Sequence, residues 1–234
     1  MDHSLMDWYF GFRIAAALES RPNELYFRSV YLPRLKAIYL PNPKVAGSTV
    51  MATLIKADGS PHLMSIENHN DHNARRLMSA KHDPRAFWRA LQDPEFFRFA
   101  FVRNPYTRIV SAYLDKIVTG SRRKLDIKAD ATLLDFLQTI STQKPRKMNR
   151  HWRPQSALIS PKVKLDFLGR FERFNDDFSE VLDRLGVDST AIREMRAHQT
   201  SANNRLDLIG VEEKALIDRI YRDDFERFGY SKEL

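Results

Sequence analysis

The chain has 234 residues, of which 43% are hydrophobic and 11% aromatic, enough apolar side chains to fill the core of a folded domain. This composition excludes an intrinsically disordered chain, and the lack of cysteine excludes disulfides, thiolate zinc sites and cysteine nucleophiles. The formal net charge of +8 predicts an anionic partner such as a nucleotide, an acidic glycan, a nucleic acid or a membrane surface.

The first 20 residues predict a helix that packs on the rest of the domain. They contain two early acidic residues, and an arginine interrupts their short apolar run. That pattern fits neither a signal peptide nor a membrane span. We therefore expect a soluble, cytoplasmic protein with a single domain over residues 1–234.

Residues 36–54, KAIYLPNPKVAGSTVMATL, predict a buried strand that turns into a helix. The strand covers residues 37–40, and the helical pattern begins after Lys44 in a turn of small residues. Because the first N–H groups of a helix lack partners within it, such a turn binds phosphate or sulfate. Lys44 adds a full charge, and Ser48 and Thr49 add hydroxyl donors. The loop differs from the nucleotide-binding pattern GxxxxGK[ST], because its lysine precedes the glycine.

Three histidines follow between residues 60 and 73, at positions 62, 69 and 72, without the spacing of a metal site. Residues 76–80 form a short apolar stretch, a candidate strand that leads to His82. Asp83 and Pro84 then predict the start of a helix. The strongest strand, residues 96–102, ends at Arg103, and Asn104 with Pro105 predicts a helix that Gly120 terminates.

Alternating strands and helices predict an α/β fold with a central parallel sheet flanked by helices. The Lys44 loop, His82 and Arg103 are expected at the same edge of this sheet, where ligands bind. The second half is more helical, with helices predicted over residues 133–140, 175–185 and 211–228 and a strand over 165–171. Between them, residues 144–153, KPRKMNRHWR, form the densest basic segment.

Arg103 and Ser111 lie eight positions apart and can clamp a second anion through a guanidinium fork and a hydroxyl donor. Together with the Lys44 loop they describe two anion sites. In these two segments the chain resembles the sulfotransferases that use 3′-phosphoadenosine 5′-phosphosulfate (PAPS), in particular the carbohydrate branch typified by chondroitin 4-O-sulfotransferases. PKVAGST is similar to their 5′-phosphosulfate loop and FVRNPYTRIVSAYLDK to their 3′-phosphate segment. HWRPQ, DFLGRFERFNDDF and YRDDFERFGY are also similar.

The resemblance implies a P-loop-like sulfotransferase fold, with PAPS as donor and a hydroxyl, expected to be that of a carbohydrate, as acceptor. It implies that Lys44 contacts the departing oxygen, that the 3′-phosphate is held by Arg103 and Ser111, and that the 5′ end is held by Lys44, Val45, Ala46, Gly47, Ser48 and Thr49. We expect no metal, because a sulfuryl group spreads a single negative charge over three oxygens. The acceptor needs a base, and His82 is the first candidate with His151 as its competitor.

The animal members of this branch carry a membrane anchor and cysteines, and neither is found in this sequence. We therefore expect a bacterial-type member and transfer neither the Golgi setting nor the chondroitin acceptor. Two other interpretations remain open. One is a basic module that binds RNA or another polyanion through residues 144–153, although no RNA-binding motif occurs. The other is a P-loop-like nucleotide or sugar kinase. Neither the identity of the acceptor nor the oligomeric state is predicted.

Overall fold

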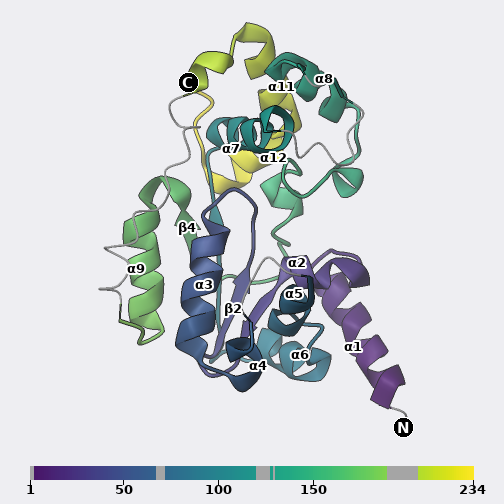
Figure 1. The fold of residues 1–234 in the computed structure, drawn as a ribbon, viewed down its shortest axis with the longest axis vertical. Coiled ribbons are helices and arrows are strands. Elements are labelled where there is room, and N and C mark those ends of the chain that lie inside the picture. Colours follow the sequence, from purple (N-terminus) through teal and green to yellow (C-terminus); the bar gives the residue numbers. More distant parts are fainter. Residues whose placement is uncertain (1–2, 67–71, 120–126, 129, 189–204) are drawn as a thin grey trace. The chain divides into compact units, whose positions relative to one another are not determined.

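The computed structural model describes residues 3–66, 72–119, 127–128, 130–188 and 205–234, and it forms two compact units (Figure 1). The sheet unit comprises Met1–Asn42, Ala46–Phe101 and Ile159–Ala197, and the helical unit comprises Pro43–Val45, Val102–Leu158 and His198–Leu234. Each unit is assembled from three separate segments of the chain. The single domain over residues 1–234 stays a prediction.

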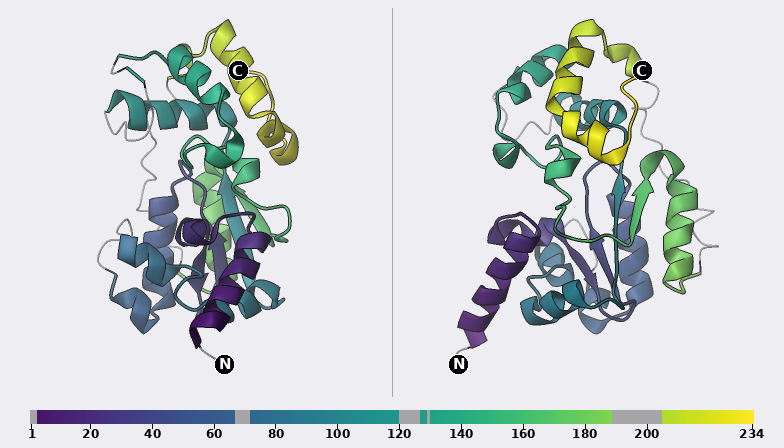
Figure 2. Two further views of the ribbon diagram at one scale, coloured as in Figure 1. Left: turned by 90° about the vertical axis from the view of Figure 1, so that its right-hand side faces the viewer. Right: turned by 180° about the vertical axis from the view of Figure 1, so that it is seen from behind.

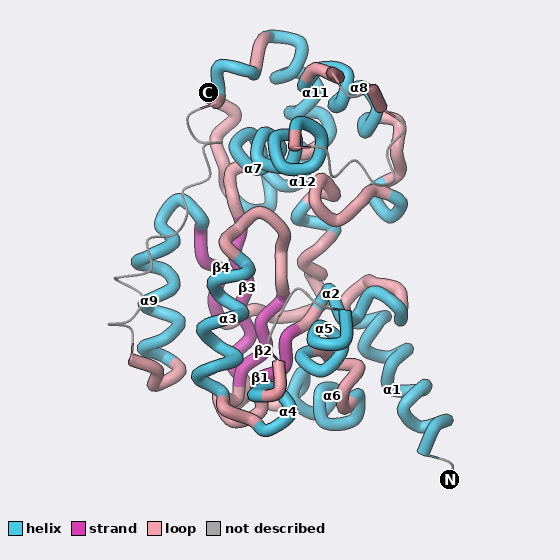
Figure 3. The backbone as a smooth tube through the Cα atoms, viewed as in Figure 1, coloured by secondary structure: helices cyan, strands magenta, loops and turns pink. Residues whose placement is uncertain are grey.

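The sheet has four strands in the order β1 (Val30–Leu32), β2 (Ala37–Leu40), β3 (Phe97–Val102) and β4 (Phe167–Arg170), drawn as magenta segments in Figure 3. β2 and β3 are parallel, with Tyr39 opposite Phe99, which confirms the α/β class. The expectation of a parallel sheet is wrong for β1, which pairs antiparallel with β2. The reason is the short turn between β1 and β2, because parallel neighbours need a long crossover connection.

The helices of the sheet unit surround these strands, with α1 beside α6 and α9 beside β4 (Figures 1 and 2). The strand expected at residues 76–80 is wrong, since residues 76–78 belong to α5. Ala74 and Met78 are both buried and lie four residues apart, which is a helical spacing. The helical elements of this unit are α1 (His3–Ala17), η1 (Pro22–Glu24), α2 (Leu25–Arg28), α3 (Gly47–Asp58), α4 (Pro61–Met64), α5 (His72–Met78), α6 (Pro84–Gln92), η5 (Phe171–Arg173) and α9 (Phe174–Arg184).

Phenylalanine rings fill the core between β3, β4 and α9. Phe101 of β3 lies 5.4 Å from Phe174 and 6.1 Å from Phe178, measured between ring centroids. A Cβ atom at Gly169 of β4 would lie 2.3 Å from the Phe101 ring. Only glycine therefore lets β4 accept this ring, which explains a glycine inside a strand.

The helical unit contains the predicted helix after β3. The Asn104 side chain accepts a hydrogen bond from the backbone of Tyr106, as its predicted capping role requires, and α7 winds into the π-helical turn η2. The long helix expected over residues 211–228 is broken at Tyr221, which has ψ of 21°. The elements of this unit are α7 (Pro105–Tyr113), η2 (Leu114–Val118), α8 (Leu133–Ser141), η3 (Pro145–Lys147), η4 (Gln155–Ala157), η7 (Leu206–Leu208), α11 (Val211–Ile220) and α12 (Arg222–Phe228).

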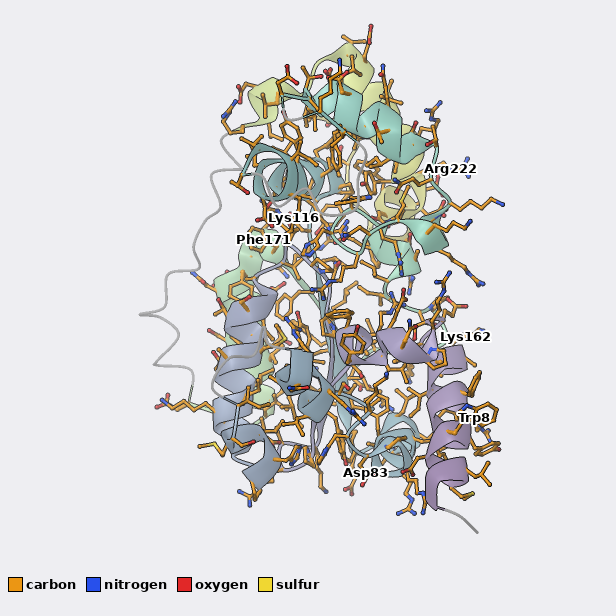
Figure 4. All side chains as sticks on the ribbon, turned by 45° about the vertical axis from the view of Figure 1, so that its right-hand side comes forward. Trp8, Asp83, Lys116, Lys162, Phe171 and Arg222 are labelled. Carbon is orange, nitrogen blue, oxygen red and sulfur yellow. The ribbon has the colours of Figure 1, made fainter. Side chains whose placement is uncertain are left out.

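A separate apolar core joins these helices. Tyr106, Phe136, Trp152 and Phe225 are among its buried side chains. Outside both cores, Trp8 projects from α1 and is 64% exposed (Figure 4). Within the described residues, no helix has both the length and the hydropathy that a membrane crossing requires.

Candidate active site

The loop after β2 has an unusual backbone. Lys44 and Ala46 both adopt left-handed conformations, with φ of 73° and 58°, although neither is a glycine. Non-glycine residues in this region are strained and persist where the surrounding structure fixes them, often at functional sites. α3 begins immediately after this loop at Gly47, as the sequence predicted, so the N–H groups of its first turn have no partner within the helix.

Arg103 lies along one face of α7. Its side chain is fully buried, and its Nε donates to Thr107 Oγ1 at 3.0 Å. Ser111 follows Thr107 by four residues and therefore lies one turn further along the same face. The Ser111 hydroxyl is buried, and the described part of the chain offers it no hydrogen-bond partner. The structure thus brings together the two residues predicted to clamp the second anion.

Lys44 lies along the same face of α7. Its backbone oxygen accepts a hydrogen bond of 3.1 Å from Arg103 Nη1, and its Nζ donates to Asp115 Oδ2 at 3.0 Å. Asp115 follows Ser111 by four residues, so Lys44 is fixed at both ends of the row formed by Thr107, Ser111 and Asp115. Only 13% of the Lys44 side chain is exposed, and burial lowers the pKa of its amine.

Arg108 fixes the base of the loop to two other parts of the site. Its guanidinium is buried and donates to the backbone oxygens of Pro43 at 3.2 Å, Arg153 at 3.0 Å and Arg150 at 3.3 Å. One side chain of α7 therefore holds the residue before Lys44 and the residues that flank His151. Sequence reasoning missed Arg108, although its position inside the 3′-phosphate segment was a usable signal.

A buried polar network holds the backbone of Arg103 in place. The Gln155 amide accepts from the backbone N–H of Arg103 at 2.9 Å and donates to its carbonyl at 2.8 Å. The buried Asp224 carboxylate in turn accepts from the backbone N–H groups of Gln155 and Ser156. Such fully paired buried groups fix backbone geometry. HWRPQ and YRDDFERFGY, the segments that supply this network, lie some 70 residues apart.

His151 lies in the same unit as Lys44, with its side chain partly buried. The pKa of its imidazole falls to about 3 because burial and the nearby cations Arg150, Lys116 and Lys44 disfavour the charged form, whereas Asp115 opposes this effect. The Nδ1 atom is buried and accepts no hydrogen bond from any described residue. The ring is thus neutral at physiological pH.

His82 lies elsewhere, in the sheet unit. It occupies the turn before α6, and its ring stacks on His62 at a centroid distance of 4.2 Å. His62 belongs to α4, which follows the carboxyl end of α3, whereas the Lys44 loop precedes the amino end of that helix. Of the other histidines between residues 60 and 73, His69 lies outside the described residues.

Of the predicted site residues, the structure brings Lys44, Arg103 and Ser111 onto one face of α7, with His151 in the same unit. Val45 is buried beside Lys44 in the chain, and Ala46, Gly47, Ser48 and Thr49 lead into the first turn of α3. Asp115, Arg108 and Gln155 are the residues that the sequence did not single out.

The family model described as "Sulfotransferase family" matches residues 28–231. This match covers the Lys44 loop, the whole of α7 and the HWRPQ segment. The chain belongs to the sulfotransferase family. Membership favours the first interpretation of the sequence over an RNA-binding module or a kinase.

Among sulfotransferases, the chain is similar to carbohydrate sulfotransferase 14 of Danio rerio, at 28% identity over 170 residues that cover 64% of this chain and 46% of the relative. The Homo sapiens protein of the same name is 28% identical, covering 64% and 44%. Carbohydrate sulfotransferase 11 of Mus musculus is 25% identical over 166 residues, covering 58% and 47%. The chain thus spans less than half of each relative. No solved structure matches it.

Proposed function

We propose that this sulfotransferase moves a sulfuryl group from PAPS to a hydroxyl group of a carbohydrate. The observation that carries the proposal is the row formed by Thr107, Ser111 and Asp115. Arg103 contacts the first of these residues and Lys44 the last, and the buried hydroxyl of Ser111 pairs with no described residue. A buried polar group without a partner is costly, which supports a ligand as its partner. The carbohydrate acceptor is supported by the names of the relatives.

The two anionic ends of one nucleotide bind at different positions along this row. Arg103 and Ser111 hold the 3′-phosphate, because a guanidinium and a hydroxyl are the donors that phosphate oxygens need. Lys44 and Val45 hold the 5′-phosphosulfate, with backbone amides from Ala46 to Thr49 at the start of α3. Arg108 holds the Lys44 loop against α7, so that the amine is positioned before the donor binds.

PAPS supplies a sulfuryl group that leaves its bridging oxygen as the acceptor oxygen attacks. The bond between sulfur and the bridging oxygen breaks while the new bond from sulfur to the acceptor oxygen forms. Lys44 stabilises the negative charge that develops on the departing oxygen. No further counter-charge is needed, since the transferring group carries one negative charge over three oxygens.

The acceptor hydroxyl loses its proton to a base, and we assign this role to His151 in preference to His82. His151 is neutral, and Lys44 is one of the cations that lower the pKa of its imidazole. His82 stacks on His62 beyond the carboxyl end of α3. The negative donor offsets Lys44 and Lys116 and so raises the basicity of His151 in the complex.

Transfer of radiolabelled sulfuryl groups from PAPS to a panel of carbohydrates tests this function. We expect label in at least one carbohydrate, and a loss of at least 100-fold in the rate for Lys44→Ala, because the charge on the leaving oxygen loses its counter-ion. Glu226→Gln, an exposed change on α12, is the control and should keep the wild-type rate. Phosphate transfer from ATP without any sulfuryl transfer would contradict the proposal.

A further inference from the structure

One carboxylate lies against the amine that the proposed reaction needs. Asp115 Oδ2 accepts from Lys44 Nζ at 3.0 Å and from Lys116 Nζ at 3.1 Å, so it bridges two ammonium groups. Lys116 is labelled in Figure 4. The Lys44 side chain is 13% exposed, whereas that of Asp115 is 41% exposed. The carboxylate therefore covers the amine from the solvent side of the pair.

The π-helical turn puts Asp115 in this place. α7 ends at Tyr113, and the backbone N–H of Thr119 donates to the carbonyl of Leu114 at 3.1 Å, a separation of five residues. π-helical turns inside α-helices recur at functional sites. Here the turn begins at Leu114 and contains both Asp115 and Lys116, so one local feature positions the carboxylate and the second lysine.

A carboxylate and a phosphate compete for the same amine. Both are anions that accept hydrogen bonds from an ammonium group, and each repels the other. Lys116 makes an exchange possible, since it continues to pair with Asp115 when Lys44 turns to another anion. Neither anion is then left without a cation.

We propose that Asp115 is a positioning residue that holds the Lys44 amine as an internal counter-ion and releases it when the anionic donor binds. The proposal rests on the function proposed above and adds to it an exchange of ion-pair partners. It predicts two effects of removing the carboxylate. The donor meets less negative charge, and Lys44 loses the carboxylate that raises the pKa of its amine.

The second effect follows from the charges around Lys44. Burial, Lys116 and Arg103 lower the pKa of the amine, whereas Asp115 raises it. His151 is also close enough to interact with Lys44, and it is neutral at physiological pH. Without the carboxylate, Lys44 loses its proton at a lower pH, so binding of an anion weakens at a lower pH as well.

Titration calorimetry of adenosine 3′,5′-bisphosphate with Asp115→Asn tests the proposal. We expect binding about 10-fold tighter than wild type at pH 7, a difference of about 1.4 kcal/mol. We also expect the alkaline loss of binding to move to lower pH. Asp115→Glu, which keeps the charge, should resemble wild type. Asp223→Asn removes an exposed carboxylate of α12 in the same unit and is the charge-matched control, with unchanged affinity.

The outcomes separate this inference from the proposed function. If wild type binds the bisphosphate and Asp115→Asn binds it equally or more weakly at pH 7, the exchange is wrong and the proposed function stands. If wild type does not bind the bisphosphate, both the exchange and the proposed function are wrong. Should Asp115→Asn fail to fold, Asp115→Ser gives the same comparison, and titration of the Lys44 amine by NMR in the nucleotide-free protein must show a pKa below the wild-type value.

Discussion

At the scale of single residues, the function of His151 depends on charges that belong to other parts of the chain. Its imidazole is kept neutral by burial and by three cations, and one of them is Lys44. A base in such surroundings is weak in the free protein. We expect its basicity to increase when an anion neutralises those cations, so that His151 acts as the proposed base only with the donor in place.

Replacement of the two candidate bases distinguishes them. We expect His151→Asn to lower turnover by about two to four orders of magnitude, as the loss of a general base does, and to keep affinity for adenosine 3′,5′-bisphosphate. His82→Asn is the matched change in the sheet unit and should retain turnover within a few-fold. A steady-state assay with PAPS measures both, and the reverse result would assign the base to His82.

The charge state of His151 also predicts how stability depends on pH. The pKa is 6.5 for an ordinary histidine and about 3 in the folded protein, so the unfolded chain binds this proton more tightly. Stability therefore falls as pH drops from about 6.5 toward 3. In urea unfolding at pH 7 and pH 4.5, we expect His151→Asn to lose less stability than wild type, by about 2 to 3 kcal/mol. An equal loss in both proteins would contradict the depressed pKa.

At the scale of elements, α7 and η2 organise the candidate site because Thr107, Ser111 and Asp115, at intervals of four residues, carry different chemical groups. The sequence predicted its start through Asn104 and Pro105, and it predicted Arg103 and Ser111 as a pair. It did not predict Asp115, because an α-helical pattern continues through residues 114–118 and gives no sign of the π-helical turn. That turn depends on the surrounding structure and not on local propensity.

Two other elements show the same limit. The apolar spacing of residues 211–228 fits one helix, and the break at Tyr221 has no local signal such as glycine or proline. The buried Tyr221 hydroxyl donates to the carbonyl of Trp152 at 2.7 Å, a contact 69 residues away that the sequence could not predict. Residues 76–80 are too short for periodicity to distinguish a strand from a helix end.

Gly169 gives a stability test for the sheet. We expect Gly169→Ala to lower the free energy of unfolding by about 1 to 3 kcal/mol, since the new methyl group overlaps the Phe101 ring, which neighbouring rings hold in place. Chemical denaturation measures this change. Gly186→Ala, with φ of 67° and open space around it, is the control for backbone strain alone. A smaller loss for Gly169→Ala than for Gly186→Ala would contradict the packing argument.

At the scale of the whole molecule, the chain passes between its two units inside the loop that follows β2. Residues 43–45 belong to the helical unit, whereas Ala46 onward belongs to the sheet unit. The family motifs indicated candidate site residues, but they did not indicate this division. A pattern read along the chain does not show which distant segments pack together, such as the carbonyls around Arg108.

At the proposed site, Arg103 and Ser111 bind the 3′-phosphate of an adenine nucleotide, and Lys44 binds its other end. The most direct measurement compares the affinities for adenosine 3′,5′-bisphosphate and adenosine 5′-phosphate in wild type, Arg103→Ala and Ser111→Ala. We predict that wild type prefers the bisphosphate by about 10- to 100-fold, the worth of hydrogen bonds to a charged group, and that both variants lose most of this preference. A wild type that binds the two nucleotides equally, or variants that keep the full preference, would contradict the account.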